Sequence, residues 1–256
     1  SWRVTGKVGV WSMMSADPEL GMIYLPTNTP APDYYGGHRP GENLFAESVV
    51  ALNLETGQRE WHFQAVHHGL WDYDFPAAPN LVDIVVAGRP VKALAQVSKQ
   101  GFLYVFDRVT GEPIWPIEDR PVLQTEVPGN YTSATQPYQA RPQTVDPIVI
   151  EGLTEEFVID YTPELKPRAL EILSQYRIGG LYVPALPENH DNDFYNNVGC
   201  QGGGNVISHP PVGDPTTGVM YVSHHRRCSA PSFLAPTGGV DEDDPNYAMP
   251  GAGGAT

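Results

Sequence analysis

Apolar and polar residues alternate along much of this chain in short runs that end at glycine, proline or aspartate, a pattern that predicts β-strands joined by turns. Residues 10–16 and 22–26 predict two strands, with Asp17-Pro18 beginning the turn between them. Residues 48–54 and 58–64 predict a hairpin. Two more strands follow, at residues 80–86 and 91–98, before a second hairpin that begins at Gly101.

That second hairpin repeats the signature of the first. Residues Asn53 to Trp61 and Asp107 to Trp115 both read Asn/Asp-x-x-Thr-Gly-x-x-x-Trp, 54 residues apart. A further repeat joins the segment at Asp17 to the segment at Asp214, since both read Asp-Pro-x-x-Gly-x-x-Tyr. Turn signatures that recur with an aromatic residue at a fixed offset are typical of a β-propeller, where the tryptophan packs between neighbouring blades. The sequence therefore predicts an all-β protein of the propeller class.

A helical insertion near residues 154–177 interrupts this pattern. Threonine caps predict one short helix near 154–159 and another from about 166 to 177, lying on a propeller face. Pro167 conflicts with the second helix, because it removes a backbone donor. Residues 121–150, rich in proline and threonine, predict irregular structure.

Charge and composition narrow the classes of partner. Charged residues are 18% of the chain and hydrophobic residues 41%, which favours a folded domain over a disordered one. The net charge of −15 argues against nucleic acid and anionic membranes as partners, and it is compatible with neutral substrates and metal ions; simple solubility is the alternative reason for it. No apolar run approaches the ~18 residues of a membrane-spanning helix.

The segment from His67 to Asp74 carries candidate chemistry. Adjacent histidines point to opposite sides of a strand, so His67 and His68 do not predict a metal site. Asp72, next to Trp71, is a candidate general base, because a partly dry loop raises the pKa of a carboxyl group. The alternative is that Asp72 caps a turn and Trp71 only packs between blades.

Lys99 and the two cysteines are the other candidates. Lys99 ends an apolar strand before a glycine turn, where it either faces an anionic ligand or is a solvated turn residue. Residues 206–210 and 218–223 predict a hairpin. In an antiparallel ladder opposite residues have a constant index sum, and Cys200 and Cys228 have the same sum as positions 208 and 220. We expect a disulfide, with two free buried thiols as the alternative.

Together these segments resemble a known family, the quinoprotein glucose and alcohol dehydrogenases, in their glucose-dehydrogenase-like branch. The resemblance rests on VWSMMSADPELGMIYLPTNTP, HHGLWDYD and AQVSKQGFLYVFDRVTGEPIW, and it is strong over residues 8–125. It continues more weakly, through QGGGN and DPTTGVMYV, to about residue 225. The repeated signature resembles the tryptophan-docking motif of that family.

The resemblance implies an eight-bladed propeller of four-stranded blades, of which this chain supplies about four. Residues 1–228 would form a partial β-propeller domain, and residues 229–256 a loop or tail leading toward a missing blade. The remaining blades would come from a longer chain or from other chains. The resemblance further implies pyrroloquinoline quinone with Ca²⁺ or Mg²⁺, a sugar or alcohol substrate, ubiquinone or a cytochrome c as electron acceptor, and a periplasmic location.

The resemblance also assigns roles by position. Asp72 resembles the catalytic base, Trp11 the tryptophan that stacks on the cofactor, and Lys99 the cation at the quinone oxygens. Asn205 resembles an asparagine near the cofactor. A flat indole suits a flat tricyclic quinone, and a cation suits the negative charge that develops on its reduction.

One departure concerns the metal. The family has Gly-Asn-Pro, with the asparagine as a metal ligand, where this chain has Asn28-Thr29-Pro30. A neutral hydroxyl is a poorer Ca²⁺ ligand than an amide oxygen, so either Thr29, or Asn28 in a shifted loop, would have to serve. The family tryptophan after GGAN is replaced by Val206, and the early glutamate ligand of the family has no counterpart here.

The functional hypothesis is therefore a periplasmic quinoprotein dehydrogenase with Asp72 as base. The rival is a non-catalytic β-propeller scaffold or binding module of the periplasm, which the threonine at position 29 favours. A third possibility is a chain that has lost the cofactor and kept an oligomeric role. The enzymatic hypothesis requires that Trp11, Asp72 and Lys99 point into one cavity.

Overall fold

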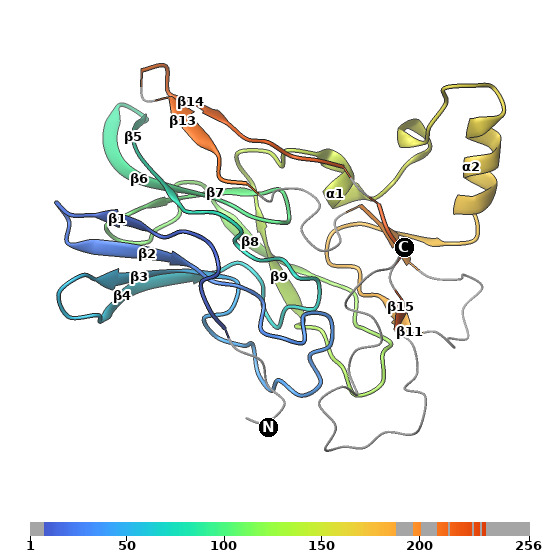
Figure 1. The fold of residues 1–256 in the computed structure, drawn as a ribbon, viewed down its shortest axis with the longest axis horizontal. Coiled ribbons are helices and arrows are strands. Elements are labelled where there is room, and N and C mark those ends of the chain that lie inside the picture. Colours follow the sequence, from blue (N-terminus) through green and yellow to red (C-terminus); the bar gives the residue numbers. More distant parts are fainter. Residues whose placement is uncertain are drawn as a thin grey trace.

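The computed structural model of this chain is described for residues 8–187, 197–200, 209–214, 216–226, 228–230 and 232–233. Strands dominate, and Figure 1 shows the two main sheets at one end of the molecule with the helices at the other. Within the described residues no helix is long and apolar enough to cross a membrane.

The first sheet is an antiparallel meander of four strands, in the order in which they occur along the chain. It consists of β1 (Ser15–Asp17), β2 (Met22–Pro26), β3 (Ser48–Asn53) and β4 (Arg59–Gln64). These strands follow the predicted ones, except that the first is shorter, because residues 10–14 are not in a strand. A sheet of this kind is the unit expected of one propeller blade.

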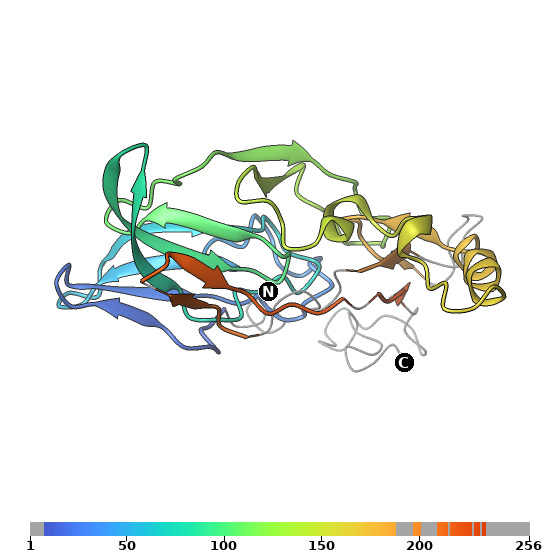
Figure 2. The same ribbon diagram turned by 90° about the horizontal axis from the view of Figure 1, so that it is seen from above.

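The second sheet has three antiparallel strands and packs against the first. It contains β5 (Asn80–Val86), β6 (Arg89–Val97) and β7 (Leu103–Asp107). The Phe63 ring on β4 lies 4.9 Å from the Phe106 ring on β7, measured between centroids. Figure 2 shows the two sheets as adjacent layers, and the main hydrophobic core lies between them.

The repeated turn signature joins the two sheets. The Asn53 side chain accepts hydrogen bonds from two turn amides at 3.0 Å, and Asp107 accepts the equivalent pair at 2.9 and 3.2 Å. The Trp61 indole donates to the carbonyl oxygen of Arg108 in the second turn, at 3.2 Å. A Cβ atom on Gly111 would lie 2.6 Å from the Trp61 ring, so glycine is required where the ring docks. The predicted docking of tryptophan between blades is confirmed at Trp61.

The second hairpin departs from the prediction after its turn. Residues beyond Gly111 make the Phe106–Pro113 bridge and two backbone hydrogen bonds at 2.8 Å, from the Asp107 amide to Glu112 and from the Ile114 amide to Val105, before the chain leaves the sheet. Pro113 and Pro116 have no amide to donate, so a full ladder cannot form there. The next strand, β8 (Ile117–Pro121), instead pairs with β9 (Thr135–Gln139). The expectation of irregular structure over residues 121–150 is therefore wrong in part.

The helical insertion is present, with different boundaries. It comprises α1 (Pro147–Glu151), a 3-10 turn (Glu155–Phe157) and α2 (Leu165–Leu173). Pro167 is the third residue of α2, where the backbone N–H has no partner within the helix, so it does not disturb the helix. The helix ends earlier than expected because Arg177–Gly179 forms a strand, β10.

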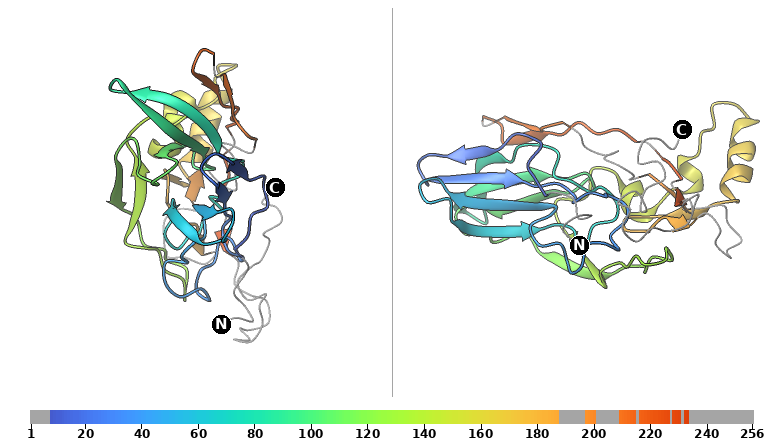
Figure 3. Two further views of the ribbon diagram at one scale, coloured as in Figure 1. Left: turned by 90° about the vertical axis from the view of Figure 1, so that its left-hand side faces the viewer. Right: turned by 60° about the horizontal axis from the view of Figure 1, so that its bottom comes forward.

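The last described strands are short. β10 pairs in parallel with β12 (Asn197–Gly199), and β11 (Leu186–Pro187) pairs in parallel with β15 (Ser232–Phe233). β13 (Val212–Asp214) and β14 (Val219–Tyr221) form a hairpin with the turn signature at Asp214. Figure 3 shows this hairpin beside β5.

The predicted disulfide between Cys200 and Cys228 is present. The hairpin from which we inferred it is wrong, because Met220 pairs with Gly213 and not with residue 208. The bonded pair is instead flanked by a bridge between Gly199 and Ser229, in which each amide donates to the other carbonyl oxygen at 2.9 Å. Gly199 and Ser229 have the same index sum as Cys200 and Cys228, so the sum predicted this bridge correctly. It did not predict the pairing of the hairpin.

Candidate functional site

Lys99 is the centre of a buried cluster of charges. It lies on the turn after β6 and is 8% exposed, so the alternative of a solvated turn lysine is wrong. Its Nζ atom lies 2.8 Å from Asp72 Oδ1 and 2.9 Å from Asp74 Oδ2. Its backbone N–H also donates to the Asp74 carbonyl oxygen, at 3.2 Å. The loop between β4 and β5 is thereby fixed to the turn between β6 and β7.

Trp11 completes this cluster from the segment before β1. Its Nε1 donates to Asp74 Oδ2 at 3.0 Å, and Lys99 Nζ lies 5.8 Å from the centre of its ring. The side chain is nevertheless 57% exposed, so much of the ring remains open to a ligand. The structure therefore brings together three residues that the sequence had proposed: Trp11, Asp72 and Lys99. The residue that joins them, Asp74, had no assigned role.

The backbone at Asp72 is unusual. Its φ is +58°, in the left-handed region that non-glycine residues rarely adopt. Its carboxylate bonds Lys99 rather than a turn amide, contrary to the turn-cap alternative. Trp71 beside it is buried, donates to the Val183 carbonyl oxygen at 3.2 Å, and stacks on Tyr73. In this loop Trp71 therefore packs in the core, while Asp72 beside it pairs with a charge.

Burial and charge set the protonation of this cluster. Burial raises the pKa of Asp72 to about 7; Lys99 opposes the shift, and the carboxylates of Asp74 and Asp33 reinforce it. Burial by itself would lower the pKa of Lys99, but the two adjacent aspartates outweigh it and raise that pKa. Near neutral pH Lys99 is therefore charged, and Asp72 is able to take up or release a proton.

A second buried carboxyl group, Glu47, lies behind the cluster. Its Oε1 accepts hydrogen bonds from Thr29 Oγ1 at 2.7 Å and from the Tyr73 amide at 3.2 Å. The Thr29 amide in turn donates to Asp74 Oδ1 at 2.6 Å. Glu47 is fully buried, and this burial raises its pKa to about 8. Sequence reasoning missed Glu47, because its only local signal is a carboxylate immediately before an apolar strand.

The oxygens of the residues predicted to bind a metal are hydrogen-bonded within the protein. The Thr29 hydroxyl is bonded to Glu47, and the Asn28 side-chain oxygen accepts the Gly9 amide at 2.6 Å. Across the described part of the chain, no three His, Cys, Asp or Glu side chains gather as metal ligands. The role of Thr29 or Asn28 in metal binding stays a prediction, and no metal enters the chemistry derived below.

Two further expectations concern other residues. Asn205 lies outside the described residues, so its role at the cofactor also stays a prediction. His68 is fully buried, stacks on Tyr131 with the ring centroids 3.7 Å apart, and pairs its Nδ1 with the Gly41 carbonyl oxygen. His68 therefore has a structural role.

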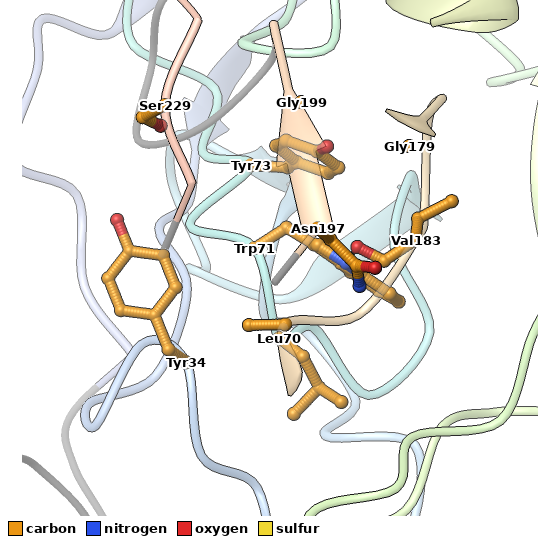
Figure 4. A pocket seen from close by; sticks show the side chains of 10 residues that line it. Tyr34, Leu70, Trp71, Tyr73, Gly179, Val183, Asn197, Gly199 and Ser229 are labelled. Atoms are coloured by element: carbon orange, nitrogen blue, oxygen red, sulfur yellow. The ribbon is translucent and has the colours of Figure 1, made fainter. Parts of the chain in front are cut away.

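An aromatic pocket is formed beside the loop that carries Asp72 (Figure 4). Trp71 and Tyr73, the residues on either side of Asp72, line it together with Leu70, Val183 and Tyr34, and its volume of about 450 Å³ includes space open to solvent. Burial, reinforced by the charges of Asp72, Asp33 and Asp74, raises the pKa of Tyr34. The residues that line this pocket do not include Trp11, Asp72 or Lys99, so the requirement that these three point into one cavity stays a prediction.

Comparisons with known proteins agree on one family. A family model described as the glucose/ethanol/alcohol dehydrogenase β-propeller domain matches residues 1–248. The chain is 41% identical to the quinoprotein glucose dehydrogenase of Escherichia coli (strain K12) over 129 residues, which are 50% of this chain and 16% of that protein. It is 33% identical to the glycerol dehydrogenase large subunit of Gluconobacter oxydans (strain 621H) over 263 residues, covering 98% of this chain and 34% of that protein.

A solved structure supports the fold. A europium-containing methanol dehydrogenase superposes with a TM-score of 0.52 and 21% sequence identity, over 86% of this chain and 30% of that one. At this identity the likeness bears on the fold alone, and together with the family model it confirms the propeller class. The chain spans between about a sixth and a third of the length of these relatives.

Proposed function

This chain belongs to the β-propeller family of glucose, ethanol and alcohol dehydrogenases, and from that premise we propose that it carries the catalytic base and part of the cofactor site of a quinoprotein oxidoreductase. The reaction would be oxidation of a sugar or alcohol hydroxyl to a carbonyl group. The proposal rests on one observation above all: Lys99 contacts Asp72 at 2.8 Å and lies 5.8 Å from the centre of the exposed Trp11 ring.

The family implies pyrroloquinoline quinone as cofactor, and the residues present fit it. Trp11 is anchored at its indole nitrogen while more than half of the side chain stays exposed, which suits a stacking surface for a flat ring system. Lys99 offers the adjacent positive charge. Held by these two residues, the quinone would supply the hydride acceptor for oxidation of the substrate's carbinol carbon.

Asp72 would take the other product of the oxidation, the hydroxyl proton. As the substrate O–H bond breaks, its proton passes to the Asp72 carboxylate while the C–O bond becomes a carbonyl double bond. A pKa near 7 suits this step, because the group is substantially ionised at neutral pH and is still basic enough to accept the proton. Lys99 holds the carboxylate in place and stays charged throughout.

The rest of the assembly follows from the same proposal. Electrons would pass on to ubiquinone or a cytochrome c, the protein would act in the periplasm, and further blades would complete the ring. Ca²⁺ or Mg²⁺ is proposed as the accompanying metal and is added in the assay; in the described part of the chain no three His, Cys, Asp or Glu side chains gather as its ligands.

Turnover of the full-length protein tests the proposal. The protein is incubated with pyrroloquinoline quinone and Ca²⁺ or Mg²⁺, and reduction of a dye is followed with sugars and alcohols. We expect Asp72→Asn to lower kcat by about 10²–10⁴-fold, the usual contribution of a positioned base. Asp119→Asn, at an exposed carboxylate on β8, is the matched control and should leave kcat unchanged. Full turnover by Asp72→Asn would show that the base is elsewhere.

A non-catalytic periplasmic propeller is the second candidate. The replacement of the family asparagine by Thr29 favours it, together with the hydrogen bonds that the Thr29 hydroxyl and the Asn28 side-chain oxygen already make. Absorbance of the purified full-length protein after addition of the quinone distinguishes the two. The dehydrogenase acquires a bound-quinone band, and the binding module acquires none.

A further inference from the structure

Glu47 is a buried carboxyl group that the proposed reaction does not use. It immediately precedes β3 and is 0% exposed, although burying a carboxyl group away from water is costly unless something fixes and satisfies it. Its contacts reach toward both aspartates of the candidate site. Each contact is made through a neighbouring residue, and Glu47 itself does not touch Lys99 in the described structure.

The first contact reaches the backbone of Asp72. Glu47 Oε1 accepts the amide of Tyr73, the residue that directly follows Asp72, at 3.2 Å. Asp72 has a φ of +58°, and a strained conformation of this kind persists only where the surroundings impose it. The bond from Tyr73 to Glu47 fixes the peptide group on the carboxyl side of that strained residue.

The second contact reaches the side chain of Asp74. Thr29 donates its hydroxyl to the same Glu47 oxygen at 2.7 Å, while its amide donates to Asp74 Oδ1 at 2.6 Å. Asp74 in turn accepts both Lys99 and the Trp11 indole on Oδ2. One carboxyl oxygen of Glu47 is thus connected to both Asp72 and Asp74, the residues whose negative charges face Lys99.

The surroundings of Glu47 are shaped to hold it. A Cβ atom on Gly69 would lie 2.0 Å from Glu47 Oε2, so only glycine leaves room for the carboxyl group. Arg39 donates to the Gly69 carbonyl oxygen at 2.8 Å and so fixes that glycine. The backbone of Glu47 is itself bonded on both sides, with its amide donating to Asn28 and its carbonyl accepting from Ala65.

From this geometry we propose that Glu47 is a positioning residue for the reaction: by accepting Thr29 and Tyr73 on one oxygen, it sets the places of the Asp74 and Asp72 carboxylates around Lys99. The inference rests on the proposed function for its kinetic consequence. Its structural consequence, the placement of two carboxylates, does not depend on turnover.

Three variants of the full-length protein test the kinetic consequence. Glu47→Ala removes the acceptor and should lower kcat by about 10²-fold, the loss typical of a misplacement near 1 Å, with KM changed far less. Glu47→Gln keeps an oxygen that accepts both bonds and should restore kcat to within about threefold of the wild type. Thr29→Val removes only the hydrogen bond that connects Glu47 to Asp74 through Thr29, and it should lower kcat by about tenfold.

Thr27→Val is the matched control. Thr27 is also buried and lies two residues from Thr29. Its hydroxyl donates to the Phe45 carbonyl oxygen at 2.7 Å and accepts the Ser48 amide at 2.8 Å, so its side-chain bonds go to backbone groups and not to the Glu47 carboxyl group. The same chemical change there should reduce stability and leave kcat unchanged. If Thr29→Val and Glu47→Ala lower kcat no more than Thr27→Val does, Glu47 has no positioning role.

Crystal structures of the variants decide the inference without any assay. In Glu47→Ala the carboxylates of Asp74 and Asp72 should both move relative to Lys99 Nζ, and in Thr29→Val that of Asp74 should move, whereas in Thr27→Val and Glu47→Gln both should stay in place. Where Glu47→Ala fails to fold, Thr29→Val carries the test. A wild type without quinone-dependent turnover would defeat the proposed function alone. Unmoved carboxylates in Thr29→Val and Glu47→Ala would defeat the positioning role alone.

Discussion

Two buried cations in this protein each bridge a pair of aspartates, with opposite results. Arg108 lies between Asp17 and Asp83, at 2.8 and 2.7 Å, where the turns of the two sheets meet. Lys99 lies between Asp72 and Asp74, at 2.8 and 2.9 Å, in the candidate site. Burial acts on the carboxyl groups of both centres, yet the pKa of Asp17 is lowered while that of Asp72 is raised.

The difference lies in how many donors each carboxylate receives. Asp17 accepts Arg108 on one oxygen and the amides of Glu19 and Leu20 on the other, and these bonds outweigh the effect of burial on its pKa. Asp72 accepts Lys99 alone among the described residues, so burial dominates. A fully bonded aspartate stabilises the fold as an anion, and an under-bonded one is able to exchange a proton.

The largest effect is expected at Arg108. Arg108→Met leaves the Asp17 carboxylate buried without its counter-charge and removes a link between the two sheets, so the free energy of unfolding should fall by about 3–5 kcal/mol. Denaturant or thermal unfolding of the full-length protein measures this. Arg120→Met is the control, because Arg120 pairs with Glu118 at the surface, where both side chains are about half exposed and an ion pair contributes little. Equal losses in the two variants would contradict the contrast.

A smaller loss of stability is expected at Lys99, about 1–3 kcal/mol for Lys99→Met. Asp72, one of the two aspartates that remain, already takes up a proton near neutrality. Without the cation the pKa of Asp72 rises further, so the deficit should be smallest in acid and should grow as the pH rises past 7. Unfolding measured at several pH values checks this, and a deficit independent of pH would mean that Asp72 stays ionised.

The smallest expected effect is a change in melting temperature at Asp72, and its dependence on pH has a definite sign. A carboxyl group with a raised pKa contributes stability that is present below its unfolded pKa, near 4, and is lost as the pH rises through its folded pKa, here about 7. Asp72→Asn removes that loss, so at pH 8 the variant should melt roughly 2–4 °C above the wild type and at pH 4 at the same temperature.

At Asp17 the dependence of stability on pH should have the opposite sign. Its pKa is lowered, so its contribution is present above the unfolded pKa and is lost as the pH falls below about 4. Asp17→Asn should therefore destabilise the protein at neutral pH and lose that effect in acid. Melting curves of both variants across pH 3–8 test the pair, and shifts of the same sign would remove the distinction between the two centres.

Local chemistry explains what the sequence could predict. The turns at Asn53 and Asp107, and the docking of Trp61 on Gly111, depend on residue types at fixed short spacings, which are readable without a fold. Asp72 and Lys99 were candidates from their local sequence, Trp11 was added through the family resemblance, and the structure then brought the three together.

What could not be predicted depends on partners distant in the chain. Glu47 is recognisable only through Thr29 and Tyr73, which lie 18 and 26 residues away. The pairing of β8 with β9, in place of a closed second hairpin, depends on two prolines whose effect appears only once the competing strand is known. The Cys200–Cys228 bond was predicted correctly through the wrong pair of strands.

The central claim is that the Asp72 carboxylate, held by Lys99 beside the Trp11 ring, accepts the substrate proton. The dependence of kcat on pH in the quinone-loaded full-length protein tests it most directly. We predict that kcat rises with pH through an apparent pKa near 7, as Asp72 ionises, and that this rise is absent from the residual activity of Asp72→Asn. A kcat that is constant from pH 5 to 9, or a rise that persists in Asp72→Asn, would contradict it.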